Sequence, residues 1–169
     1  PGTYLVNAAN EASTSLQKIG TGKPTVWVAR YAGNPGGEFP QTPLAKWLDV
    51  YFNNTSGVQD VEIRVQYSAE EIAGLGEGSL RLYWWNGTEW LVCSDGGVNT
   101  EQNYVWARLL PTTTPGIGNL GGTPFAVGTT SGGFALWWIL VVIAALILLV
   151  VVGRFVLGAV ARRRNYYYE

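Results

Sequence analysis

The sequence contains no histidine and no methionine, and Cys93 is its only cysteine. Without histidine the chain lacks the usual general base, the partner of a nucleophilic cysteine and the ligands of common zinc sites. We therefore predict a protein that is not an enzyme and has no cofactor or metal. One cysteine also cannot form an internal disulfide, so Cys93 is either a buried apolar residue, which we favour, or a site of lipidation or intermolecular pairing.

Charged residues are scarce as well, at 14 % of the chain, whereas aromatic residues reach 13 % and Gly numbers 22. This composition is typical of β-rich modules and differs from that of disordered chains. Residues 1–153 hold seven Lys and Arg against eleven Asp and Glu, a net charge of −4, and residues 154–169 hold four Arg against one Glu, a net charge of +3. Because the larger part has no basic stripe to contact phosphates, we predict no nucleic-acid binding.

The only long apolar run covers residues 134–152. It has 19 residues without a charge, and 14 of them are Phe, Leu, Ile or Val. As a helix this run would be about 28 Å long, which matches the hydrocarbon core of a bilayer. A buried helix of a soluble protein would need a core on all sides, and the rest of the chain has β patterns. We therefore predict a linker over 128–133, one transmembrane helix over 134–161 and a cytoplasmic tail over 162–169.

The charges that flank this run predict its orientation. Three arginines follow it and the preceding flank is uncharged, so the positive-inside rule places the N-terminal domain outside the cell membrane and the C-terminus in the cytoplasm. Arg154 would lie near the inner boundary, either as an anchor or as a contact to a partner subunit or an anionic lipid. The predicted interface anchors are Trp137 and Trp138 on the outer side and Arg162, Arg163 and Arg164 on the inner side.

Strand patterns fill the part of the chain before this run. Residues 60–67 alternate polar and apolar side chains, which predicts a strand with one solvated face. Residues 47–52 precede it across turn formers at 53–57, which predicts an antiparallel pair. Asn-Gly at 86–87, between residues 80–85 and 88–93, predicts a hairpin with a type I′ turn. The spacing of Ser68 and Glu71 fits a capping box and predicts one helical turn over 69–73.

These segments combine into a prediction of the fold. Further strands are expected over 4–6, 25–29, 104–109 and 125–127, which gives about seven short strands. Such a pattern predicts an antiparallel β-sandwich over residues 1–127, although the spacing would also admit a closed barrel. The main module is expected over about 44–127, and the Gly/Pro-rich stretch 33–43 is either a long loop or a boundary to an N-terminal piece.

Three segments carry a resemblance to a known family: SLRLYWWNGTEWLVC, NYVWARL and TPFAVG, which lie within residues 79–128. With these segments, residues 45–126 resemble repeat modules of large bacterial and archaeal surface proteins. The resemblance implies an Ig-like sandwich at the cell surface that acts as a spacer, adhesive unit or carrier and transfers no catalytic site. The C-terminal order of domain, linker, helix and arginines is similar to surface-protein anchoring tails. A sortase-type motif is missing before the helix, which favours retention in the membrane.

Several residues are candidates for binding or modification. Asn53, Asn54 and Asn86 head Asn-x-Ser/Thr triplets and are candidate glycosylation sites, although Asn is also expected in turns, which we favour. Aromatic residues could form a platform on which sugars stack. Alternate residues of a strand face opposite sides, however, so we expect the aromatic residues on one side to be buried in the core. This platform would comprise Tyr83, Trp84, Trp85, Trp90 and Trp106.

Two further segments have weaker signals. The loop with Asp95, Asn99, Glu101 and Asn103 offers oxygen ligands for Ca²⁺, but its spacing is not that of an EF-hand, so a plain polar loop is favoured. Residues 20–24 lack the spacing of a phosphate-binding loop.

The sequence thus favours a non-catalytic, membrane-anchored β-sandwich that acts as a structural or protein-interaction module. Its expected partners are the lipid bilayer and other membrane or surface proteins. One alternative is an accessory single-helix subunit whose β domain docks on the outer face of a membrane complex. A second is a carbohydrate-binding surface module.

Overall fold

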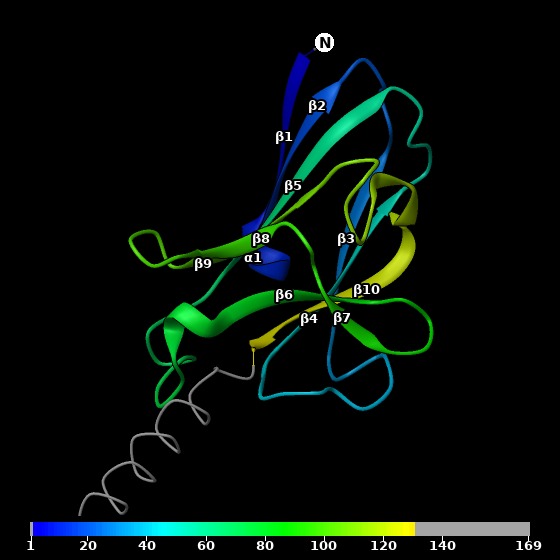
Figure 1. Cartoon of the computed structure of the whole chain (residues 1–169). Helices are drawn as coiled ribbons and strands as arrows, with labels where there is room; N and C mark the ends of the chain where they lie inside the picture. Colours follow the sequence, from blue (N-terminus) through cyan, green and yellow to red (C-terminus); the bar gives the residue numbers. More distant parts are fainter. Residues whose placement is uncertain (1, 131–169) are drawn as a thin grey trace, which may run out of the picture. The chain divides into compact units, whose positions relative to one another are not determined.

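The computed structural model describes residues 2–130 (Figure 1). Within this range no helix is long and apolar enough to cross a membrane. The strands are β1 (Gly2–Ala8), β2 (Thr14–Gly20), β3 (Val26–Tyr31), β4 (Pro43–Phe52), β5 (Val58–Gln66), β6 (Leu80–Trp85), β7 (Trp90–Val92), β8 (Gly96–Asn99), β9 (Tyr104–Leu109) and β10 (Gly121–Thr129). The short helices are α1 (Ala9–Ala12), η1 (Glu77–Ser79) and η2 (Ile117–Asn119).

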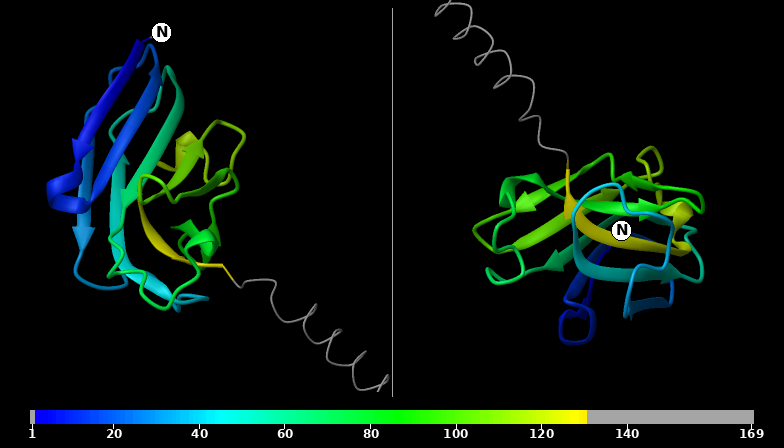
Figure 2. Two further views of the ribbon diagram at one scale, coloured as in Figure 1. Left: turned by 90° about the vertical axis from the view of Figure 1, so that its left-hand side faces the viewer. Right: turned by 90° about the horizontal axis from the view of Figure 1, so that it is seen from below.

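The strands form two antiparallel sheets of five strands each, which pack as two layers (Figure 2). The first sheet has the order β1-β2-β5-β9-β8 and the second has the order β3-β4-β10-β6-β7. Apolar residues of both sheets meet in one core cluster. The fold is therefore an all-β, two-sheet antiparallel sandwich, as predicted, and it is compatible with an Ig-like module.

The core follows the predicted alternation. Val61, Ile63 and Val65 of β5 are completely buried, and the polar residues between them face outward. Leu48 of β4 and Phe125 of β10 close the same core from the second sheet. The period-two pattern predicted the buried face of β5 correctly, because one face of the strand is buried and the other is solvated.

One predicted strand pair is wrong. Residues 47–52 belong to β4, which pairs with β3 and β10 in the second sheet, whereas β5 pairs with β2 and β9 in the first sheet. The turn formers at 53–57 reverse the chain, but they carry it from one layer to the other. Both strands still bury their apolar faces in the shared core, so the pattern itself does not distinguish a hairpin from a crossing between sheets.

The residues before position 44 contribute strands to both sheets. β2 pairs with β1 and β5, and β3 pairs with β4. Each of the eight expected segments contains a strand, and the prediction missed β2 and β8, so residues 2–130 hold ten strands where about seven were expected. In β2 the two large apolar residues, Leu16 and Ile19, point to opposite faces and conceal the alternation. Most of the stretch 33–43 forms the long connection between β3 and β4.

The hairpin of β6 and β7 forms, but its turn differs from the prediction. Trp85 pairs with Trp90, which makes the loop two residues longer than a type I′ turn at 86–87 would allow. Gly87 (φ +98°) is the only loop residue with positive φ. The Asn86 side-chain oxygen accepts the backbone N–H groups of Thr88 and Glu89, both at 2.8 Å. This local capping by Asn86 stabilises the longer loop in place of the tight turn.

Two other local predictions hold in part. The capping box forms, because Glu71 accepts the Ser68 N–H at 2.8 Å and Ser68 Oγ accepts the Glu71 N–H at 3.3 Å. Where one helical turn was predicted over 69–73, the chain forms hydrogen-bonded turns, with the Ala73 N–H donating to the Glu70 carbonyl at 3.3 Å, and no helix. At the other predicted boundary, β10 runs to Thr129, so the first two residues of the predicted linker belong to the sheet.

Candidate functional site

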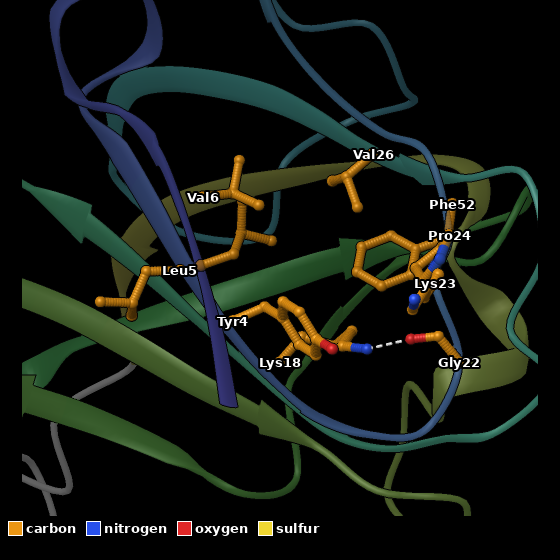
Figure 3. Close-up of a pocket in the computed structure, with 10 residues that line it drawn as sticks. Tyr4, Leu5, Val6, Lys18, Gly22, Lys23, Pro24, Val26 and Phe52 are labelled. Atoms are coloured by element: carbon orange, nitrogen blue, oxygen red, sulfur yellow. Dashed lines mark hydrogen bonds between the residues drawn. The ribbon is translucent and has the colours of Figure 1, made fainter. Parts of the chain in front are cut away.

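An apolar pocket of about 330 Å³ lies between β1 and β3, the edge strands of the two sheets (Figure 3). β1 and β3 pair with β2 and β4, respectively, and not with each other, so this side of the sandwich stays open. Val6 and Val26 are only partly buried and pack against the core from this side. The apolar lining is provided by Tyr4, Leu5, Val6, Leu16, Pro24, Val26 and Phe52.

Lys18 lies in the wall of this pocket. It follows Leu16 on the inward-facing side of β2 and is only 4 % exposed. Its Nζ donates a hydrogen bond to the Gly22 carbonyl oxygen and lies 4.3 Å from the centre of the Tyr4 ring (Figure 3). The exposed residue Lys23 lines the same pocket. The pocket thus combines an apolar interior with two cationic side chains.

Glycines fix the loop that carries the Gly22 carbonyl. Thr21 and Gly22 donate their N–H groups to the Gly57 carbonyl at 2.9 and 3.0 Å, so the β2–β3 and β4–β5 connections lie in direct contact. A Cβ atom at Gly22 would collide with the Ser56 carbonyl oxygen. Residues 20–24 therefore form a tight packing contact between two loops.

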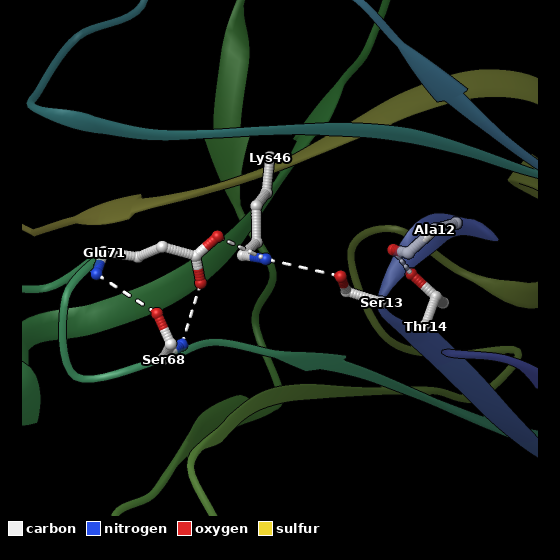
Figure 4. Close-up of polar contacts among 6 residues, drawn as sticks. All are labelled: Ala12, Ser13, Thr14, Lys46, Ser68 and Glu71. Carbon is white, nitrogen blue, oxygen red and sulfur yellow. Dashed lines mark hydrogen bonds and ion pairs between the residues drawn. The ribbon is translucent and has the colours of Figure 1, made fainter. Parts of the chain in front are cut away.

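A polar cluster lies at the opposite end of β4 and β5 (Figure 4). Lys46, which is 8 % exposed, places Nζ 2.9 Å from Glu71 Oε1 and 3.4 Å from Ser13 Oγ. Burial alone would raise the pKa of Glu71, but the hydrogen bonds from Lys46 and Ser68 outweigh burial and lower it. The cluster (Ser13, Lys46, Ser68 and Glu71) thus neutralises one buried lysine with a carboxylate.

A second cluster of aromatic side chains covers the outer face of the second sheet. The Phe39 ring lies 5.3 Å from Trp47, 4.8 Å from Tyr83 and 5.4 Å from Trp90, between ring centres. Trp90 Nε1 donates to the Gly37 carbonyl at 3.2 Å. The β3–β4 connection is therefore held against the sheet by this aromatic cluster, and Trp47, Tyr83 and Trp90 are buried beneath it.

This arrangement separates the residues of the predicted sugar platform. Tyr83, Trp85 and Trp90 belong to the aromatic cluster, and Trp84 points into the main core, where its Nε1 donates to Thr123 Oγ1 at 2.7 Å. Trp106 lies on β9 in the first sheet. The five side chains therefore do not share a surface. Three of them pack in the aromatic cluster, one packs in the main core, and Trp106 lies on the other sheet.

The candidate glycosylation sites all lie in turns, as the favoured interpretation expected. The Asn53 side-chain oxygen accepts the Thr25 N–H and the Asn54 oxygen accepts the Ser56 N–H, both at 2.8 Å. Asn86 caps the β6–β7 loop. The Asn54 and Asn86 oxygens each stabilise a local turn, whereas the Asn53 oxygen connects the end of β4 to the residue that precedes β3. Glycosylation of the three amides stays a prediction.

The remaining predicted residues have simple environments. Cys93 is buried and unpaired, as favoured, and burial raises the pKa of its thiol. In the loop considered for Ca²⁺, the Asn99 oxygen accepts the Gln102 N–H at 2.9 Å, and within residues 2–130 no group of three or more acidic or cysteine side chains could hold a metal ion. The residues predicted to contact the membrane lie outside the described residues: Trp137, Trp138, Arg154, Arg162, Arg163 and Arg164.

The sequence did not predict this pocket, although Gly22, Lys23 and Pro24 lie in the segment 20–24 that was considered and rejected as a phosphate-binding loop. The signal that could have found the pocket is a lysine at an inward position, two residues after Leu16, which is detectable only once β2 is recognised as a strand. Comparison with protein-family models, with curated proteins and with solved structures finds no significant match for this chain.

Proposed function

We propose that this chain is a non-catalytic β-sandwich, held outside the cytoplasm by a C-terminal membrane helix, that acts as a structural or protein-interaction module at the cell surface. The two-sheet fold supports a module of this kind. The apolar run 134–152 and the following arginines support the anchor and its orientation. The resemblance of residues 45–126 to surface-protein repeat modules supports the location.

The observation that carries this proposal is the two-sheet sandwich of residues 2–130 followed in sequence by the apolar run 134–152. The end of β10 limits the length of chain between them. The strand continues to Thr129, and the Thr130 N–H donates to the Ser79 carbonyl at 2.8 Å. Only residues 131–133 then separate the sandwich from the apolar run. Three residues span at most about 10 Å when fully extended, so an anchored sandwich would lie close to the bilayer surface.

Protease added to intact cells tests the anchor and its orientation. The sandwich should be digested once it is destabilised by mild denaturant, leaving a membrane-protected fragment that contains residues 134–169. Protection of the sandwich in intact cells, combined with its digestion in permeabilised cells, would refute the proposed topology. Recovery of the whole chain in the soluble fraction would refute the anchor.

The short spacer also favours a second candidate, an accessory subunit whose sandwich docks on the outer face of a membrane complex. Unless further domains precede Pro1, a module that projects an adhesive surface gains little from a spacer of three residues, whereas a docked domain needs its contact surface near the membrane. The polar cluster lies near this end, because β4 begins beside the end of β10, where Pro43 pairs with Gly128. Its charged groups suit an environment of head groups and polar loops.

A flexible insert distinguishes the two candidates. Twenty Gly and Ser residues inserted after Thr130 should weaken complex assembly of an accessory subunit, because the effective concentration of the sandwich at its docking surface falls as the linker lengthens. A rigid insert of equal length serves as the control for added mass. Assembly that is unchanged by the flexible insert would leave the surface module as the function.

A further inference from the structure

Lys18 brings a positive charge into the wall of an otherwise apolar pocket. Its two neighbours there, the Gly22 carbonyl and the Tyr4 ring, are both neutral. Within residues 2–130 no carboxylate forms an ion pair with Lys18. An ammonium group has three N–H donors, so donor capacity is left for an anion that enters the pocket.

Lys46 provides the matched comparison in the same chain. It is buried to a similar degree, 8 % exposed against 4 % for Lys18, and it meets Glu71 at 2.9 Å. A buried charge is expensive unless it is paired, and the fold pairs Lys46 from within. The chain thus supplies a carboxylate to one buried lysine and leaves the other facing a cavity.

The shape of the pocket limits what can bind. Its volume of about 330 Å³ falls at the lower end of the range for small-molecule sites. Val6, Leu16, Val26 and Phe52 offer apolar contacts, and the open side between β1 and β3 gives access from solvent. A short hydrocarbon chain fits such a lining, and an anionic end group would meet Lys18, with Lys23 as a second cation at the same pocket.

We propose that the pocket between β1 and β3 binds a small amphipathic carboxylate, with its hydrocarbon chain between the two sheets and its carboxylate on Lys18. Of the two buried lysines in residues 2–130, Lys46 receives its counter-ion from the chain, and the ligand supplies one to Lys18. This site does not depend on the membrane anchor or on the surface role, so each can fail without the other.

The first test compares head groups on one hydrocarbon chain. The full chain in phosphatidylcholine nanodiscs is titrated with octanoate, octanol and octylammonium, and empty nanodiscs measure partition into lipid. Saturable binding of octanoate is expected, and it should be at least about tenfold tighter than binding of octanol or octylammonium. Neither of these two probes can form the charge-assisted hydrogen bond between a carboxylate and Lys18. Equal binding of the three probes, or partition into lipid without saturation, would overturn the proposal.

Variants locate the site. Lys18→Met should remove the preference for octanoate over octanol, whereas Lys46→Met, which changes the other buried lysine, should leave it intact. Val26→Phe should weaken binding of both probes by filling the pocket. A preference that survives Lys18→Met, or that is lost equally in Lys46→Met, would place the carboxylate elsewhere. The head-group comparison on the unchanged chain decides the question even where Lys18→Met fails to fold.

Discussion

Lys46 and Glu71 form an ion pair of 2.9 Å between side chains of very different exposure, 9 % for Lys46 and 38 % for Glu71. The lysine lies on the inner side of β4, and Glu71 reaches it from the turns that follow β5. A capping box with Ser68 holds Glu71 in place. The buried charge of Lys46 is therefore paired with the carboxylate of Glu71, which belongs to a short segment at the surface.

This pair predicts a pH dependence of stability. Because the folded state lowers the pKa of Glu71, its contribution is present above the unfolded pKa of about 4.3 and is lost as the pH falls through the lower folded value. Glu71→Gln should cost about 1–2 kcal/mol at pH 7, between the values for exposed and buried pairs, and should reduce the loss of stability toward pH 3. Urea denaturation at both pH values measures this.

Glu70→Gln is the matched control for that experiment. Glu70 is exposed and forms no ion pair within residues 2–130, so its replacement should change the free energy of unfolding by less than about 0.5 kcal/mol. Equal effects of the two substitutions would contradict a specific role of Glu71.

The aromatic cluster predicts that Phe39 holds the β3–β4 connection in place. Phe39→Ala removes a ring that contacts three aromatic neighbours and should destabilise the sandwich by about 2–3 kcal/mol, less than for a fully buried ring. Chemical denaturation followed by tryptophan fluorescence measures the loss. Glu38→Ala, at the exposed neighbouring position, should have little effect, and a similar loss in both variants would point to the loop backbone instead.

Cys93 should be unreactive in the folded protein. Burial raises the pKa of the thiol and keeps reagents away, and the thiolate is the reactive form. A maleimide at pH 7 should label the unfolded chain in guanidinium within minutes and leave the folded chain unlabelled over the same time. Rapid labelling under native conditions, or recovery of a disulfide-linked dimer, would support the alternative role in intermolecular pairing.

Arg154 provides a test of the proposed membrane segment. If the three following arginines determine the topology, as we propose, Arg154→Leu should leave insertion and orientation unchanged. Glycosylation-site mapping or protease protection would report the orientation. An inverted or uninserted chain would show that Arg154 itself determines topology, whereas normal insertion with loss of complex assembly would identify it as a partner contact.

The sequence by itself determined much of the secondary structure and the class of the fold. The alternation in residues 60–67, the hairpin around Asn86 and the burial of Cys93 could all be predicted, because each depends on local periodicity, on turn-forming residues or on the usual burial of a free cysteine. The β2 strand could not be predicted in this way, since Leu16 and Ile19 face opposite sides. The type of turn at Asn86 was also predicted wrongly. The Asn86 side chain accepts backbone N–H groups of the loop and so stabilises a longer loop than the tight turn.

Only the tertiary structure decided which strands share a sheet and what the chain presents at its open side. The crossing between β4 and β5 and the aromatic cluster beneath Phe39 join residues that are distant in sequence or lie in different layers. The same is true of the pocket, where Tyr4, Lys18 and Phe52 meet because β1, β2 and β4 end or begin at one end of the sandwich. A strand pattern specifies which of its faces is buried, and the partner that covers this face is chosen by the packing of the whole domain.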